Sequence, residues 1–167
     1  MTFRTGATFS DDMVYRYRLW RRWDETAMPL MFLLLNPSTA NEFEDDPTVA
    51  RCIKRARRMG FGGVEVCNLY ARRSTDPDLL YNLDPRLSIG PDNESEIFAA
   101  SQICSAIICG WGTHGKKINK FWPNQVREII KSNRAVSALG FNEDGSPKHP
   151  LYLGYNIEPV PFVLDDD

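Results

Sequence analysis

Four short polar motifs along the chain have the composition of loops that could together bind one ligand. They are Asn36-Pro37-Ser38-Thr39-Ala40, Asn68-Leu69-Tyr70, Gly110-Trp111-Gly112 and Lys148-His149-Pro150-Leu151-Tyr152. Each of the first three directly follows an aliphatic run of the kind that forms a buried strand. Because parallel strands deliver their carboxyl ends to one edge of a sheet, we expect the four motifs to meet there.

The first motif offers polar groups but no base. Asn36 can orient a water or a ligand, although an amide cannot take up a proton as a general base. Three carboxylates follow closely, at Glu44, Asp45 and Asp46. Asp46 precedes Pro47 and therefore suits a helix N-cap, so Asp45 is the carboxylate without an obvious structural role.

The second and third motifs combine base-reading and phosphate-binding chemistry. Asn68 can donate and accept hydrogen bonds at once, which suits the edge of a nucleobase, although Asn is also a common turn residue. The cations Arg72 and Arg73 follow the second motif, and Lys116 and Lys117 follow the third. All four could contact phosphate.

The last motif holds a histidine, His149, with no evident role in a core. An imidazole in such a loop could donate to an anionic oxygen that forms as a bond breaks. The chain's other histidine, His114, lies in a glycine-rich turn and is more typical of a surface position.

The elements that must position these groups alternate between strands and helices. Apolar runs predict strands at residues 30–35, 64–67, 106–109 and 135–139, and helices are expected over residues 47–60, 94–106 and 122–131. We therefore expect an α/β, three-layer domain with a short, mostly parallel four-stranded sheet. The whole chain, residues 1–167, reads as a single domain with a core over about residues 28–155.

The first expected helix is strongly amphipathic. Val49, Ile53 and Ala56 form its apolar stripe, and cations occupy the opposite face, namely Arg51, Lys54, Arg55 and Arg58. Two interpretations stay open: a solvated face that complements the helix dipole, or a surface that contacts phosphate.

Composition excludes several classes of protein. The net charge of −2 argues against a uniformly basic nucleic-acid coat but permits a local basic face. The four cysteines lack zinc-like spacing and are expected as core thiols, with no metal and no cofactor. No apolar run is long enough to span a membrane, and the first residues lack a signal core, so we expect a cytoplasmic protein.

The motifs resemble two families. The first is a bacterial and phage domain family of unknown function, whose signature is similar to Leu35 to Ala40, Asp45 to Thr48, Asn68-Leu69, Trp111-Gly112 and His149 to Tyr152. The second, more distant, is the uracil-DNA glycosylase superfamily. Its first loop resembles Leu34 to Ser38, its base-reading Asn resembles Asn68, and its late His-Pro-Ser loop resembles His149-Pro150-Leu151.

The second resemblance implies a uracil-DNA-glycosylase-like fold and a base-releasing mechanism. Asn36 or Asp45 would place the attacking water, and His149 would stabilise the departing base anion. Further substrate contacts would come from Pro37, Ser38, Thr39, Asn68, Trp111, Leu151 and Tyr152. The chain has Leu151 and Ser38 where the superfamily has serine and glycine, which argues against uracil itself as the base.

Two functions of different class remain. One is an N-glycosidase that releases a modified or damaged base from DNA or a nucleotide. The other is a non-catalytic nucleotide or nucleic-acid binding module that keeps the same pocket, which the lack of an acidic residue at position 36 favours. A third interpretation takes the motifs only as turns of a structural protein. Base identity, strand preference and oligomeric state stay open.

Overall fold

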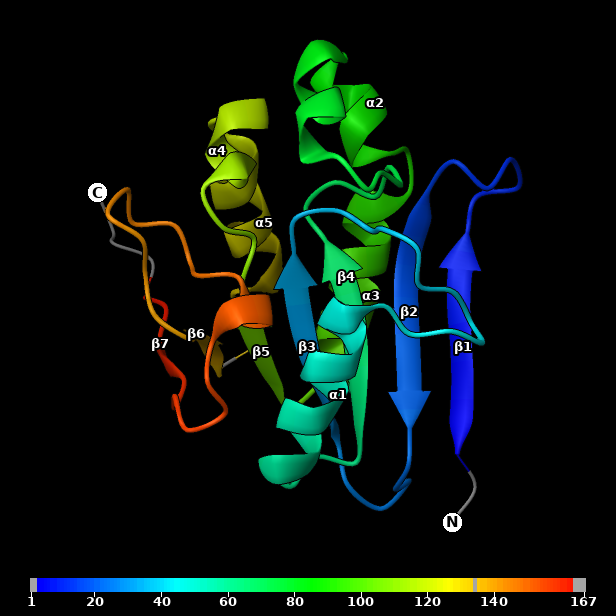
Figure 1. The fold of residues 1–167 in the computed structure, drawn as a ribbon, viewed down its shortest axis with the longest axis vertical. Coiled ribbons are helices and arrows are strands. Elements are labelled where there is room, and N and C mark those ends of the chain that lie inside the picture. Colours follow the sequence, from blue (N-terminus) through cyan, green and yellow to red (C-terminus); the bar gives the residue numbers. More distant parts are fainter. Residues whose placement is uncertain (1–2, 134, 164–167) are drawn as a thin grey trace.

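The chain folds around a seven-stranded mixed sheet. A computed structural model describes residues 3–133 and 135–163. The strand order is β1-β2-β4-β3-β5-β6-β7 (Figure 1). The strands are β1 (Arg4–Phe9), β2 (Arg16–Arg22), β3 (Pro29–Leu34), β4 (Gly63–Asn68), β5 (Ala106–Cys109), β6 (Val136–Ala138) and β7 (Val160–Pro161). The central strands β4, β3, β5 and β6 are parallel, and β1, β2 and β7 add antiparallel edges.

The predicted four-stranded, mostly parallel sheet is therefore wrong, although the four apolar runs do form the central strands. The missing strands are the outer ones. β2 has the sequence RYRLWRR, whose arginines read as a charged cluster, and β7 is only two residues long. β2 lies between β1 and β4, and its arginines are buried or half-buried, so charged side chains interrupt the continuous apolar run that marks the central parallel strands.

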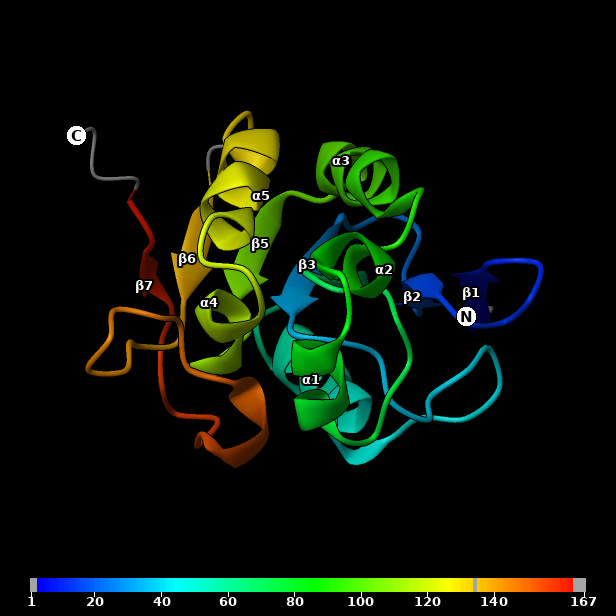
Figure 2. The same cartoon turned by 90° about the horizontal axis from the view of Figure 1, so that it is seen from above.

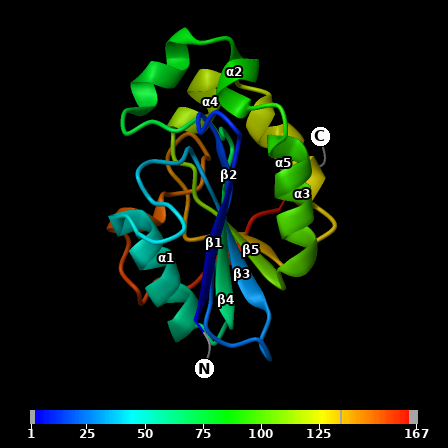
Figure 3. The same cartoon turned by 90° about the vertical axis from the view of Figure 1, so that its right-hand side faces the viewer.

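Helices cover both faces of the sheet. α1 (Pro47–Arg58) lies on one face, and α3 (Asn93–Ile103) and α5 (Trp122–Ile130) lie on the other (Figures 2 and 3). Asp46 caps α1 as expected, because its carboxylate accepts from Val49 N at 2.9 Å. The helix ends before Gly60, whose φ of +83° suits glycine. Within the described residues no helix is long and apolar enough to cross a membrane.

Short helices lie at the carboxyl edge of the central strands. They are the 3-10 helix η1 (Pro77–Asn82), α2 (Pro85–Ile89) and α4 (His114–Ile118), drawn at the top of Figure 1. A further 3-10 helix, η2 (Pro150–Tyr152), packs against α1. These segments, with the loop of residues 35–46, surround the edge at which a ligand site was expected.

The sheet separates two apolar clusters. On the α1 face, Leu30, Phe32 and Leu34 alternate with residues that face α3 and α5, such as Met31 and Leu33. All four cysteines are buried and free, and burial raises the pKa of each thiol. The expectation of core thiols is thus confirmed.

A β-bulge in β2 controls which face its first residue occupies. Thr8 pairs with Arg18 and Phe9 pairs with Arg16, so Tyr17 is the extra residue. Alternation along a strand would place Arg16 on the α3 face. The bulge instead moves its side chain to the α1 face, where Nη1 donates to Ala40 O at 2.9 Å.

Candidate functional site

The ends of β3 and β4 form the centre of the candidate site. Leu34 and Asn68 are partners in the parallel register, and they are the last residues of their strands. Two residues beyond Leu34, the Asn36 amide nitrogen donates to Ser74 O at 2.9 Å and to Pro37 O at 3.2 Å. Since carbonyls can only accept, these bonds fix the amide orientation and leave Asn36 Oδ1 as the acceptor for a water or ligand.

Asn68 carries a buried hydrogen-bond donor without a partner. The residue is 1% exposed, and its Nδ2 has no hydrogen-bond partner among the residues that the structure describes. Its backbone is held separately, because Asn93 Nδ2 donates to Asn68 O at 2.9 Å. An unpaired buried donor is costly, and a ligand acceptor would remove that cost.

The His149 loop packs onto the same face through Gly110. A β-carbon at position 110 would lie 2.9 Å from Pro150 Cδ, 3.2 Å from Lys148 O and 3.3 Å from Leu34 Cδ2. Leu34, the register partner of Asn68, therefore lies close to the loop that carries His149. Asn36 follows Leu34 by two residues, Asn68 is the register partner of Leu34, and the His149 loop packs near Leu34 at Gly110. Three of the expected groups are thus carried by segments that lie close to Leu34.

The tautomer of His149 follows from its place at the start of η2. Nδ1 accepts from Leu151 N at 3.3 Å, so the proton of the neutral ring is on Nε2. Burial lowers the pKa of His149, and the nearby Asp46 carboxylate only partly opposes that shift. His149 is therefore a neutral donor through Nε2–H at neutral pH.

Sequence reasoning missed Arg16 and the second role of Asp46. Arg16 is 2% exposed, and its Nε has no hydrogen-bond partner among the described residues. Burial lowers the pKa of Arg16 to about 10, so it stays a cation, and the Asp46 carboxylate attracts it. Asp46 thus interacts electrostatically with both Arg16 and His149. The sequence signal that could have identified this strand is the alternation of Arg16, Arg18 and Arg22 with apolar residues.

Two expected site residues have structural partners instead. The Asp45 carboxylate lies 2.8 Å from Arg21 Nη2, within an ion pair whose arginine is buried. Trp111 is 2% exposed and belongs to the core cluster that faces α5, with its ring tilted against Phe162. Its indole has no exposed surface on which a base could stack.

The remaining expected contacts differ in exposure. Pro37 is buried, Ser38 and Leu151 are half-buried, and Thr39 is exposed. Tyr152 is 87% exposed on η2, so its ring is free to contact a ligand.

The four cations expected to contact phosphate, which we term the phosphate rim, lie in two segments at the carboxyl edge of the sheet. They are Arg72, Arg73, Lys116 and Lys117. Arg73 donates to Met13 O at 3.3 Å and lies over the Phe9 ring. Lys116 Nζ lies 3.4 Å from Asp144 O. Arg72 is half-buried and Lys117 is exposed. Phosphate contact by these four residues stays a prediction.

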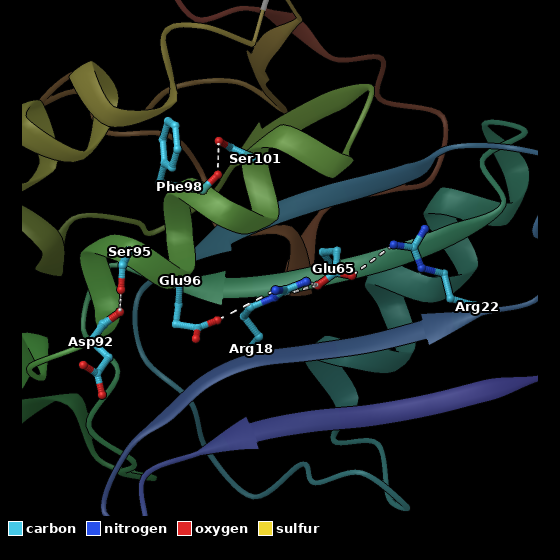
Figure 4. A network of polar contacts seen from close by, with 8 residues as sticks. All are labelled: Arg18, Arg22, Glu65, Asp92, Ser95, Glu96, Phe98 and Ser101. Carbon is cyan, nitrogen blue, oxygen red and sulfur yellow. Dashed lines mark hydrogen bonds and ion pairs between the residues drawn. The ribbon is translucent and has the colours of Figure 1, made fainter.

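A second polar cluster lies on the α3 face, around Glu65 (Figure 4). Its carboxylate accepts from Arg18 and from Arg22 at 3.1 Å each, and Arg18 also pairs with Glu96 at 3.8 Å. Burial raises the pKa of Glu65 in spite of both arginines. A cavity of about 570 Å³ adjoins the cluster, but Glu65 is on the face opposite α1 and the His149 loop.

Comparison with known families gives one match. Residues 16–151 match the profile of DUF1643, described as a protein of unknown function. No curated protein and no solved structure matches the chain.

Proposed function

The chain belongs to the DUF1643 family, whose function is unknown, and from its site we propose that it binds a nucleobase and cleaves the N-glycosidic bond between base and sugar. The observation that carries the proposal is the unpaired, buried Asn68 amide on the face that also receives His149. A base edge offers the acceptor that this donor lacks. The neutral imidazole of His149, in the loop that packs near Leu34, would stabilise a base anion.

The proposed reaction displaces the base with water. The water oxygen bonds to the anomeric carbon, and the base leaves with the electron pair of the broken C–N bond. His149 Nε2–H donates a hydrogen bond to the anionic base, and Asn36 Oδ1 orients the water by accepting a hydrogen bond from it. The proton that the attacking water loses neutralises the base anion, so the products are the free base and a sugar with a hydroxyl group at the anomeric carbon. Because Asp45 is paired with Arg21, water positioning falls to Asn36, while Asp46 can offset positive charge on the sugar.

The substrate contacts outside the base would come from the rim and from η2. Arg72, Arg73, Lys116 and Lys117 would contact phosphates, and the exposed Tyr152 ring would fill the space that a flipped base leaves in the stack. Unstacking costs a few kcal/mol and favours modified, damaged or mismatched bases, which is the substrate class we propose.

The second candidate is a non-catalytic binding module that uses the same residues. It is favoured by the fixed Asn36 amide and the ion-paired Asp45, which leave no free carboxylate at either expected water-positioning residue. Such a module would bind nucleotides through Asn68 and His149 without breaking a bond.

Single-turnover base release distinguishes the two candidates. Purified protein is incubated with oligonucleotides that carry uracil, mismatched thymine or modified pyrimidines, and with the matching nucleotides, and abasic product is measured. His149→Ala should lower the rate by about 10²–10³, the usual cost of losing one such donor. His114→Ala is the matched control, since His114 contacts Tyr81 at η1.

The outcomes separate cleanly. Wild-type rates in His149→Ala would disprove the role of His149. If no substrate releases its base, but nucleotides bind and Asn68→Ala weakens that binding, the binding module replaces the glycosidase. If neither release nor binding occurs, both candidates fail.

A further inference from the structure

α1 carries a dense group of cations, which we term the α1 basic face. It consists of Arg51, Lys54, Arg55, Arg57 and Arg58. The helix contains no acidic residue, although the whole chain has a net charge of −2. Lys54, Arg57 and Arg58 are exposed, Arg51 is half-buried, and Arg55 is buried. The charge is therefore concentrated locally, and three of its five cations are accessible.

Carboxylates of the described residues do not neutralise this charge. Across residues 3–133 and 135–163, no cation of the α1 basic face has a carboxylate within ion-pair distance. Arg18, Arg21 and Arg22 of β2, in contrast, each pair with at least one carboxylate. The helix dipole favours cations in the last turn, but Arg51 and Lys54 lie before it.

One tyrosine holds four of these cations together. The Tyr155 ring centroid lies 4.6 Å from Arg51 Cζ, 4.8 Å from Lys54 Nζ, and 5.6 and 5.7 Å from Cζ of Arg55 and Arg58. Cation–π contacts order the side chains but leave their net charge in place. Mutual repulsion among ordered cations is relieved by a bound anion.

The α1 basic face is continuous with the candidate site. Arg55 donates to Gly154 O at 2.8 Å and to Ile157 O at 2.9 Å, and Arg51 donates to Leu153 O. This segment directly follows η2, which begins after His149 and packs against α1. A polymer held on α1 would therefore run next to the His149 loop.

We propose that the α1 basic face binds the sugar-phosphate backbone of a nucleic acid strand and presents that strand to the His149 loop. Arg51, Lys54 and Arg58 lie three and four residues apart along one stripe, which spans about 10 Å at a rise of about 1.5 Å per residue. That is roughly the rise of three nucleotides in a duplex strand, at about 3.4 Å each. The inference rests on the proposed function for the site beside it, and it adds a polymer-binding surface distinct from Arg72, Arg73, Lys116 and Lys117.

Salt-dependent binding tests this surface. Fluorescence anisotropy measures the affinity of labelled single-stranded and duplex oligonucleotides without modified bases, between 50 and 200 mM salt. We expect the exposed pair Lys54→Gln/Arg58→Gln to reduce the slope of log affinity against log salt by about 1.4–1.8. From counterion release alone, affinity at about 0.1 M salt should fall roughly 20- to 60-fold.

The matched control removes two cations elsewhere. Arg86→Gln/Lys120→Gln has the same charge change at two exposed positions outside α1, and it should change affinity by less than about twofold. Thermal melting of both variants checks folding, and the single variants Lys54→Gln and Arg58→Gln replace the pair if it unfolds. Each should lower the slope by roughly half as much.

The result is independent of base release. If no base is released but the α1 pair still weakens salt-dependent binding, the proposed chemistry fails and this inference stands. Equal affinity and salt slope in the α1 variants and wild type would overturn it. Binding to vesicles of phosphatidylserine and phosphatidylcholine, without binding to any oligonucleotide, would also overturn it in favour of a membrane surface.

Discussion

A β-carbon on Gly110 would lie 2.9 Å from Cδ of Pro150, closer than real side chains approach. The end of β5 therefore accepts the His149 loop only because residue 110 has no side chain. Pro150 follows His149 directly, so the close approach at Gly110 determines where the imidazole lies. The position of His149 thus depends on a residue that needs no contact with a ligand.

Gly110→Ala should displace the His149 loop. We expect a loss of about 1–3 kcal/mol in stability from overpacking, and a fall of at least tenfold in base release or nucleotide binding. Gly145→Ala is the control, because its β-carbon would have nothing within 4 Å although its φ is +78°. It should cost about 1–2 kcal/mol through backbone strain, with ligand affinity unchanged. Equal loss of binding in both variants would contradict this account.

Replacement by alanine should lower stability much more at Asn93 than at Asn68. Asn93 donates to two backbone carbonyls, of Asn68 and Leu69, whereas Asn68 Nδ2 donates to none within the described chain. Asn93→Ala should therefore lower the free energy of unfolding by about 2–3 kcal/mol, and Asn68→Ala by about 1 kcal/mol or less. Denaturant unfolding measures both. A larger stability loss for Asn68→Ala would show that its amide is a structural group.

Arg18→Ala should destabilise the protein in a pH-dependent way. Burial already raises the pKa of Glu65, and removing one of its two arginines should raise it further. A raised pKa in the folded state means that stability is lost as the pH rises through that pKa. We expect a deficit of about 3 kcal/mol at pH 7.5, which shrinks toward pH 5 as Glu65 gains a proton. The double variant Arg18→Ala/Glu65→Gln should show no such shrinkage.

His149 should make stability fall on the acid side of neutrality. Burial lowers its pKa in the folded state below the ordinary value of 6.5. The unfolded chain then binds more protons as the pH falls below about 6.5, so the contribution of His149 is complete above that pH and is lost below it. His149→Gln should flatten the decline in unfolding free energy between pH 7.5 and pH 5.5. An unchanged pH profile would mean that the imidazole is not desolvated.

The central strands and α1 could be predicted because their signals are local. Residues 30–35 and 106–109 are apolar without interruption, since both faces of those strands are buried. Asp46-Pro47 and Gly60 mark the ends of α1 through cap chemistry that a few neighbouring residues determine. These features survive in a single sequence because they need no distant partner.

The outer strands and several site residues could not be predicted, because their partners are distant in sequence. Arg18 and Arg22 are acceptable in β2 only because Glu65 lies beside them on β4. Asp45 read as a free carboxylate because its partner, Arg21, belongs to a strand that was not foreseen. The glycines around Trp111 indicated a loop residue, but its side chain is buried in the apolar cluster that faces α3 and α5.

The extra residue at Tyr17 determines what a deletion in β2 would do. Removing Tyr17 would make Arg16 the direct neighbour of Arg18, and alternation along a regular strand would then keep Arg16 on the α1 face, with its bond to Ala40 O in place. The strand would lose its bulge but not this contact. Relatives that are one residue shorter at this point should therefore have a regular β2 and still carry an arginine at the position of Arg16.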